Sequence, residues 1–178
     1  MRPTASRAAP EAMVDADSFE SFYRGQVDIV YRALALTLGD SELAREAADE
    51  AMLRAYVRWS AVCGYDNPGG WVYRVGLNWA TSQWRRTRRE RPLSYLDQGS
   101  PTARSGQPGL GAVAAVSALA RLTLNHRAVV VARILLDLST AETAAALDIP
   151  TNTVKSRLAR ALQILRTALT IGDDDELR

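Results

Sequence analysis

The chain has 178 residues, 47% of them hydrophobic, and a formal net charge of +2, which suits one domain or two small ones. Because the net charge is small, affinity for nucleic acid must come from local clusters of basic residues. The single Cys63 and single His126 exclude a Cys/His zinc cluster and an internal disulfide, and no segment has the apolar run of a transmembrane helix or a signal peptide. Without a signal peptide or a membrane span, the protein is expected in the cytoplasm. No phosphate-binding glycine motif or nucleophile motif occurs, so we expect a protein that is not an enzyme and holds no metal or cofactor.

Three long helices are expected in the first half of the chain. Residues 1–17 show no periodicity and are predicted to be a disordered lead. Apolar residues at helical spacing then predict a helix from the capping residue Ser18 to Gly39 and a second helix over about 40–59. The composition of AVCGYDNPGG predicts a loop, and a third helix follows over about 68–89.

The second half also has a helical pattern. Residues 91–111 contain three prolines and four glycines and are predicted to be a flexible linker. Helical spacing resumes over 112–123 and 126–137, a pair of helices follows over 138–166, and residues 172–178 form an acidic tail. The sequence therefore predicts an all-α fold of two small helical domains, the second ending in a helix-turn-helix. The predicted domains are 18–90 and 112–171.

The pair of helices over 138–166 has the layout of a helix-turn-helix. Ser139 and Thr140 can cap the first helix, and Asp148 tolerates the left-handed backbone that the turn requires. Pro150 ends the turn and can begin the second helix. The first helix has these apolar positions: Ala141, Ala144, Ala145 and Leu147.

The second helix of this pair has one apolar face and one basic face. Residues 151–170 include four basic residues and no acid, which favours binding to a polyanion over the alternative, an αα-hairpin with solvated charges. The candidate duplex DNA-binding residues are Thr151, Asn152, Thr153, Lys155, Ser156, Arg157 and Arg160.

The third predicted helix carries a narrow polar stripe between apolar flanks and ends in RRTRRER. Basic residues beside exposed aromatic rings are typical of proteins that bind single-stranded nucleic acid. Under the alternative interpretation, the tryptophans belong to the core and the arginines are solvated at a helix C-terminus. We expect Trp71 in the core, and Trp84 with the arginines of 85–91 at nucleic acid.

The second predicted helix has an alanine-rich inward side and an outward side that mixes acids with large apolar residues. The outward residues are Glu46, Asp49, Glu50, Leu53, Tyr56 and Val57. Apolar anchors ringed by charge suit a large protein partner, whereas the alternative is a further layer of the domain's own core.

Together these segments resemble the sigma factors of bacterial RNA polymerase, specifically the small two-domain extracytoplasmic-function group. The resemblance spans about residues 18–168. GDSELAREAADEAMLRAYVRW resembles the core-binding helix, NPGGWVYRVGLNWATSQWRRTRRER resembles the promoter-melting and minus-ten segment, and TVKSRLARAL resembles the minus-thirty-five-reading helix. The chain departs from the pattern at Asp49, Asp148 and Pro150.

The resemblance implies an initiation factor with three partners: core RNA polymerase, promoter DNA as duplex and non-template single strand, and an anti-sigma factor. Loop 62–67 would hold a flipped-out base. The implied core-binding residues are Glu46, Asp49, Glu50, Leu53, Arg54 and Tyr56. The implied minus-ten and melting residues are Tyr65, Asn67, Arg74, Asn78, Thr81, Ser82, Trp84, Arg85 and Arg86. The competing hypotheses are a free-standing helix-turn-helix regulator with an N-terminal dimerisation domain and a protein-binding helical adaptor.

Overall fold

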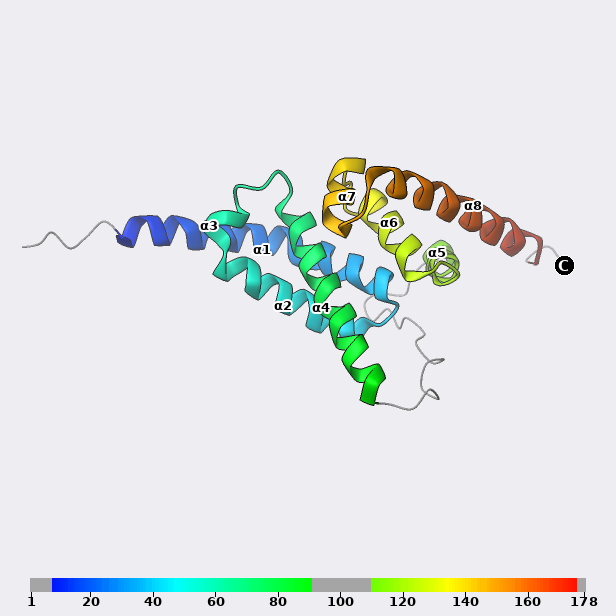
Figure 1. Cartoon of the computed structure of the whole chain (residues 1–178), viewed down its shortest axis with the longest axis horizontal. Coiled ribbons are helices and arrows are strands. Elements are labelled where there is room, and N and C mark those ends of the chain that lie inside the picture. The colour runs from blue at the N-terminus through cyan, green and yellow to red at the C-terminus, as the bar shows by residue number, and fades with distance from the viewer. Residues whose placement is uncertain (1–7, 91–109, 176–178) are drawn as a thin grey trace, which may run out of the picture.

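The computed structural model describes residues 8–90 and 110–175, and in this part of the chain the helices are joined by turns and short loops, without a strand (Figure 1). The predicted linker lies almost entirely outside the described residues. The helices are α1 (Ala8–Leu38), α2 (Ser41–Val57), α3 (Trp59–Val62), α4 (Pro68–Glu90), α5 (Leu110–Ala120), α6 (Leu124–Ile134), α7 (Thr140–Leu147) and α8 (Thr151–Asp175). The predicted all-α fold is confirmed.

In the first half, α1, α2 and α4 pack around one apolar core. The inward face of α2 is fully buried and consists mainly of alanines, which let the neighbouring helices approach closely. At Gly76 of α4, an added Cβ would lie 2.8 Å from Leu34 Cδ1 and 3.0 Å from the Ala47 carbonyl oxygen. Glycine at this position therefore permits the close crossing of α4 over α1 and α2.

The ends of α1 and α2 follow the predicted chemistry, and a cap that was not predicted from the sequence begins α4. Gly39 ends α1 with φ of 72°, and the Asp40 carboxylate accepts hydrogen bonds from the backbone N–H groups of Glu42 and Leu43 at 3.0 and 2.9 Å. Asn67 caps α4 by accepting a 2.7 Å bond from the Gly70 N–H, with Pro68 as the first helical residue. These caps fix where loop 63–67 meets α4.

Some predicted boundaries differ from the structure. Helix α1 begins at Ala8, so the predicted disordered lead is wrong from residue 8 onward and Ser18 is not the cap of this helix. Alanine, glutamate and methionine favour helix, and Pro10 is tolerated in a first turn. The Ser18 hydroxyl instead accepts a hydrogen bond from Trp59 Nε1 at 3.3 Å. The predicted loop is shorter because α3 forms one helical turn, and α8 continues through the start of the acidic tail to Asp175.

In the second half, α6 is the central helix. Five consecutive residues, 128–132, are buried, so this helix has packing partners on several sides. Val129 packs with Ala144 of α7 and Val154 of α8. Val130 packs with Leu122 and Ala161.

The two halves pack against each other, α1 along α6 and the start of α4 against α7 (Figure 1). Leu138, between α6 and α7, is fully buried in the apolar core of the first half, together with Ala128, Val131 and Ala132 of α6. An added Cβ at Gly70 of α4 would lie 3.1 Å from Leu138 Cδ2. The sequence predicted two domains on a linker, and the structure adds an intimate contact between them.

Candidate nucleic-acid interface

Helices α7 and α8 form the predicted helix-turn-helix. Ser139 and Glu142 make a capping box: the Ser139 hydroxyl accepts from the Glu142 N–H at 3.1 Å, and the Glu142 carboxylate accepts from the Ser139 N–H at 2.7 Å. Asp148 adopts the left-handed conformation, with φ of 53° and ψ of 50°, as predicted. The half-buried Ile149 then packs against the cluster that joins α6, α7 and α8.

The predicted apolar face of α7 is partly wrong. Ala144 is buried and Leu147 half-buried, but Ala141 and Ala145 are exposed and Thr143 is buried in their place. The reason is the short length of α7: in eight residues the face that meets α4, α6 and α8 is set by tertiary contacts rather than by apolar spacing.

The start of α8 presents the predicted polar face to solvent. Val154 and Ala161 are buried against the second-half core, whereas Asn152, Lys155 and Ser156 are exposed. The full predicted set divides into exposed Thr151, Asn152, Lys155, Ser156 and Arg160 and half-buried Thr153 and Arg157. The structure thus brings all seven residues onto the first ten positions of one helix.

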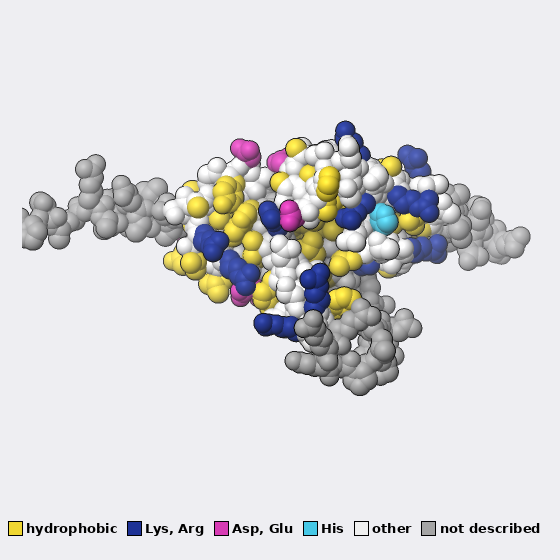
Figure 2. All heavy atoms as spheres, viewed as in Figure 1, with side chains coloured by type: hydrophobic (Ala, Val, Ile, Leu, Met, Phe, Trp, Pro, Cys, Tyr) yellow, Lys and Arg dark blue, Asp and Glu magenta, His cyan; other side chains and the backbone are white. Residues whose placement is uncertain are grey.

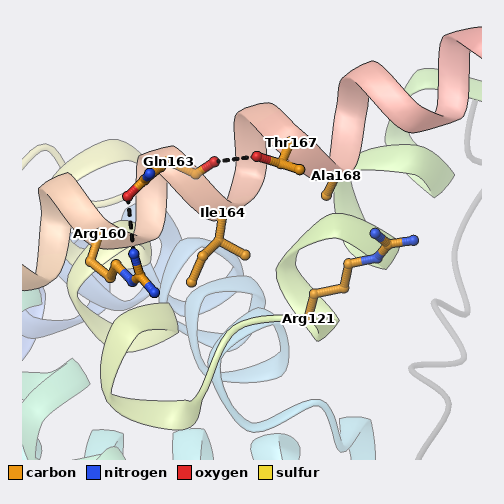
Figure 3. Close-up of a pocket in the computed structure, with 6 residues that line it drawn as sticks. All are labelled: Arg121, Arg160, Gln163, Ile164, Thr167 and Ala168. Carbon is orange, nitrogen blue, oxygen red and sulfur yellow. Dashed lines mark hydrogen bonds between the residues drawn. The ribbon is translucent and has the colours of Figure 1, made fainter.

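The Arg160 guanidinium is held by a neighbour on the same helix. Its Nη1 donates to Gln163 Oε1 at 3.1 Å, beside a shallow pocket whose opposite wall is Arg121 at the end of α5 (Figure 3). The other N–H groups of a guanidinium can still donate to phosphate or guanine. Arg160 is therefore a partly oriented cation on the exposed face of α8.

The predicted minus-ten residues lie along α4 and in the loop before it. Asn78, Ser82, Trp84, Arg85 and Arg86 are exposed, as is Tyr65 in the loop, whereas Asn67, Arg74 and Thr81 are half-buried. Trp84 is 46% exposed, and Trp71 is half-buried against the core, as the sequence predicted for each. Figure 2 shows Lys and Arg side chains over the lower turns of α4 and over the C-terminal half.

The two hydroxyls of this stripe donate to their own helix. Thr81 Oγ1 donates to the Leu77 and Asn78 carbonyls at 2.9 and 3.0 Å, and Ser82 Oγ donates to the Asn78 carbonyl at 2.8 Å. Because their protons are engaged, the oxygens of these hydroxyls remain available as hydrogen-bond acceptors. The cationic donors of the stripe are then the arginines.

The outward face of α2 is a solvent-exposed apolar surface. Leu53, Tyr56 and Val57 are 57%, 56% and 75% exposed, so the alternative of a further core layer is wrong. Glu46, Asp49 and Arg54 are also exposed, and Arg54 pairs with Glu50 at 2.8 Å. Large exposed apolar side chains ringed by charge are typical of surfaces that contact a protein partner.

Two arginines of α6 hold neighbouring turns, a structural role that was not predicted from the sequence. Arg133 donates to the Leu138 carbonyl and so holds the turn before α7, and Arg127 Nη2 donates to the Leu122 carbonyl at 3.1 Å. Burial lowers the pKa of Arg127. The sequence signal for this environment is the uninterrupted apolar run AVVVA between the two arginines. A helix segment that is apolar on all sides is buried on all sides, so polar residues at its ends lie near the core.

Among the described residues, no helix is long and apolar enough to cross a membrane, and no group of His, Cys, Asp or Glu could hold a metal ion.

Comparison with known proteins identifies relatives of both halves. Residues 112–165 match the family of sigma-70, region 4. An RNA polymerase sigma-E factor of Streptomyces avermitilis is 34% identical over 158 residues, covering 88% of this chain and 88% of the relative. The extracytoplasmic-function (ECF) RNA polymerase sigma factor SigM of Mycobacterium tuberculosis is 33% identical over 161 residues, covering 90% of this chain and 81% of the relative.

Two solved structures share the fold. The sigma factor RpoE of Bartonella quintana, solved with the anti-sigma factor NepR, superposes with a TM-score of 0.70 at 18% identity and covers 86% of this chain and 98% of that one. CnrH, solved with the cytosolic domain of CnrY, gives a TM-score of 0.60 at 22% identity, covering 92% and 95% of the two chains.

Proposed function

The chain belongs to the extracytoplasmic-function group of RNA polymerase sigma factors, which direct core polymerase to specific promoters, and we propose how its surfaces divide that task. The helix-turn-helix reads duplex DNA, α4 with its preceding loop captures single-stranded DNA, and the outward face of α2 binds polymerase. The free-standing regulator considered from the sequence is not favoured by the relatives.

The start of α8 reads the minus-thirty-five element. Its exposed residues project from the end of a helix whose other face is anchored in the second-half core, so the reading face is rigid. Asn152 and Ser156 can hydrogen-bond base edges in the major groove, while Lys155 and Arg160 can neutralise phosphates. This division makes the polar residues the source of specificity and the cations the source of most of the affinity.

Helix α4 and loop 63–67 capture the opened strand. Tyr65 is exposed beside Trp71, with ring centroids 6.3 Å apart, so unstacked bases have an aromatic surface to rest on. Arg74, Arg85 and Arg86 can hold the strand's phosphates. Melting energy would come from these captured bases, with duplex contacts fixing the register.

The outward face of α2 binds core polymerase. Leu53 and Tyr56 supply apolar anchors, and Glu46 and Asp49 supply charges that complement a basic partner surface. An anti-sigma factor that binds the same surfaces would restrain the protein, and the similar RpoE was solved in complex with an anti-sigma factor. Acting with polymerase, the chain would work in the cytoplasm without an active site of its own.

The observation that carries the proposal is the acid-free, exposed face at the start of α8, on a helix-turn-helix with a complete capping box. The test is gel filtration of the purified full chain with core polymerase at low salt. Co-elution is expected, together with loss of co-elution in Leu53→Asp, which places a charge at the centre of the apolar face. Separate elution of the wild-type chain and polymerase would refute the assignment.

A further inference from the structure

A shallow pocket lies between the end of α5 and the part of α8 that follows the reading residues (Figure 3). Its volume is about 270 Å³. The residues that line it are Arg121, Arg160, Gln163, Ile164, Thr167 and Ala168. Four of these six come after the reading residues 151–160, so most of the pocket lies outside the proposed reading face. The proposed function therefore uses only Arg160 of this pocket.

The fold fixes the walls of the pocket. Ile164 packs against the buried cluster that contains Val130 and Ala161, so the floor of the pocket is anchored in the second-half core. Arg121 directly follows α5, and its backbone N–H donates to the Ala118 carbonyl at 3.2 Å. A ligand therefore meets a preformed site, which lowers the entropic cost of binding.

Two guanidinium groups make the pocket cationic. Figure 3 shows Arg121 and Arg160 on opposite sides of Ile164. No residue that lines the pocket is acidic, and among the described residues neither arginine forms an ion pair with a carboxylate. The 3.1 Å bond to Gln163 orients Arg160 and leaves its other N–H groups for an anion. Two arginines without a counter-ion at one pocket favour an anionic ligand, and a phosphate group fits the guanidinium fork.

The apolar floor distinguishes a small organic ligand from the DNA backbone. Ile164 and Ala168 lie between and beside the two arginines, and covering them requires an apolar or aromatic group, which a phosphodiester backbone does not supply. A guanidinium plane also stacks well on an aromatic ring. The volume of about 270 Å³ is close to the lower end of small-molecule pockets, which is about 300 Å³, and suits a ligand no larger than a mononucleotide.

From these observations we propose that the pocket between α5 and α8 binds a small organic phosphate, whose phosphate contacts Arg160 and Arg121 and whose organic group covers Ile164 and Ala168. The consequence rests on the function proposed above, because Arg160 also belongs to the duplex-reading face. Ligand and promoter DNA then compete for one guanidinium. The ligand lowers the affinity for the promoter, and the promoter lowers the affinity for the ligand by the same factor.

The site is tested by calorimetric titration of the full chain with adenosine monophosphate (AMP) as the probe. Saturable binding is expected, at least about tenfold tighter than that of adenosine or of inorganic phosphate, because each of these lacks one of the two groups that the pocket contacts. Arg121→Ala should weaken AMP binding roughly tenfold through loss of a charge-assisted contact. The matched control Arg32→Ala removes an exposed arginine of α1 and should leave AMP binding unchanged.

A second variant gives an independent measurement at the same pocket. Thr167 is exposed on α8, so Thr167→Glu is expected to fold and to place a carboxylate at the edge of the pocket, which should abolish AMP binding by repulsion. Absence of saturable AMP binding to the wild-type chain would overturn the proposed site. Equal affinity for AMP and adenosine, or AMP binding that both pocket variants retain, would also overturn it.

The competition is tested by promoter binding of the reconstituted holoenzyme, with and without AMP at constant ionic strength. AMP at about ten times its Kd should weaken promoter binding severalfold for the wild type and much less for Arg121→Ala. Without AMP, Arg121→Ala should bind the promoter like the wild type.

Two results would overturn the competition. Promoter binding of the wild-type holoenzyme that is unaffected by saturating AMP would show that the ligand does not compete with DNA. A loss of promoter affinity in Arg121→Ala as large as that in Arg160→Ala would assign the pocket to a DNA phosphate instead. Failure of the wild-type chain to bind polymerase would refute the proposed function, whereas the titration of the isolated chain with AMP would still decide whether the site exists.

Discussion

Removing the two cations at the reading face of α8 should separate promoter affinity from polymerase affinity. Lys155 and Arg160 are exposed, and the Arg160 bond to Gln163 leaves most of its donors available. If each neutralises one phosphate, the double variant Lys155→Ala/Arg160→Ala loses about two units, roughly 0.9 per contact, from the slope of log affinity against log salt.

This slope change gives a quantitative expectation. Between 50 and 200 mM salt, a loss of about 1.8 units shifts the ratio of wild-type to variant affinity by roughly tenfold. The variant should therefore be strongly impaired at low salt and closer to wild type at high salt. The assay is promoter binding by the reconstituted holoenzyme, measured by fluorescence anisotropy across a salt series.

A charge-matched control excludes a general electrostatic effect. Arg24→Ala/Arg32→Ala also changes the net charge from +2 to 0, since 2 − 2 = 0, but removes exposed arginines of α1. This control should retain the wild-type slope, and both double variants should retain wild-type affinity for core polymerase. An unchanged slope in the α8 variant, or an equal loss of polymerase binding, would refute the division of labour between α8 and α2.

Three further predictions follow from individual side chains. Leu53→Ala should weaken core polymerase binding roughly tenfold, because burying the 57% of Leu53 that is exposed contributes about 1–1.5 kcal/mol. The control Ile29→Ala on α1 should leave polymerase binding unchanged, and equal losses in the two variants would contradict the α2 interface. Hydrogen bonds from the Ser139 side chain and backbone lower the pKa of Glu142, so the stability it contributes is present at neutral pH and is lost as the pH falls through that lowered pKa. Glu142→Gln should flatten the decline of Tm as the pH falls below the ordinary pKa of a glutamate, and an unaltered acid profile would count against the capping box. Tyr73→Phe removes a buried 2.8 Å bond to Thr37 and should lower the free energy of unfolding by about 1 kcal/mol in urea titration, a result that a neutral substitution would contradict.

Local chemistry explains which features could be predicted from the sequence. The caps at Asp40 and Ser139 use neighbouring side chains and backbone, and the structure forms both. The left-handed Asp148 and the alanine-rich inner face of α2 are likewise consequences of short-range spacing. The division of residues between reading face and core on α8 also follows from helical periodicity.

The features that could not be predicted depend on tertiary contacts. Leu138 looks like any apolar residue before a helix, and its burial depends on Gly70, which is 68 residues away in sequence. Ala141 and Ala145 are exposed and Thr143 is buried because α7 is too short for its own pattern to fix its orientation. The contact between the halves has no local periodic signal, and the linker composition alone indicated independent domains.

The most direct test of the central claim is run-off transcription with purified core polymerase and the full chain on a template whose start site has been mapped in cells after induced expression. We predict a specific transcript that requires both proteins and is strongly reduced in Lys155→Ala/Arg160→Ala at low salt. A transcript no greater than that from core polymerase alone, together with tight binding of the isolated chain to the same promoter as a dimer, would contradict the account.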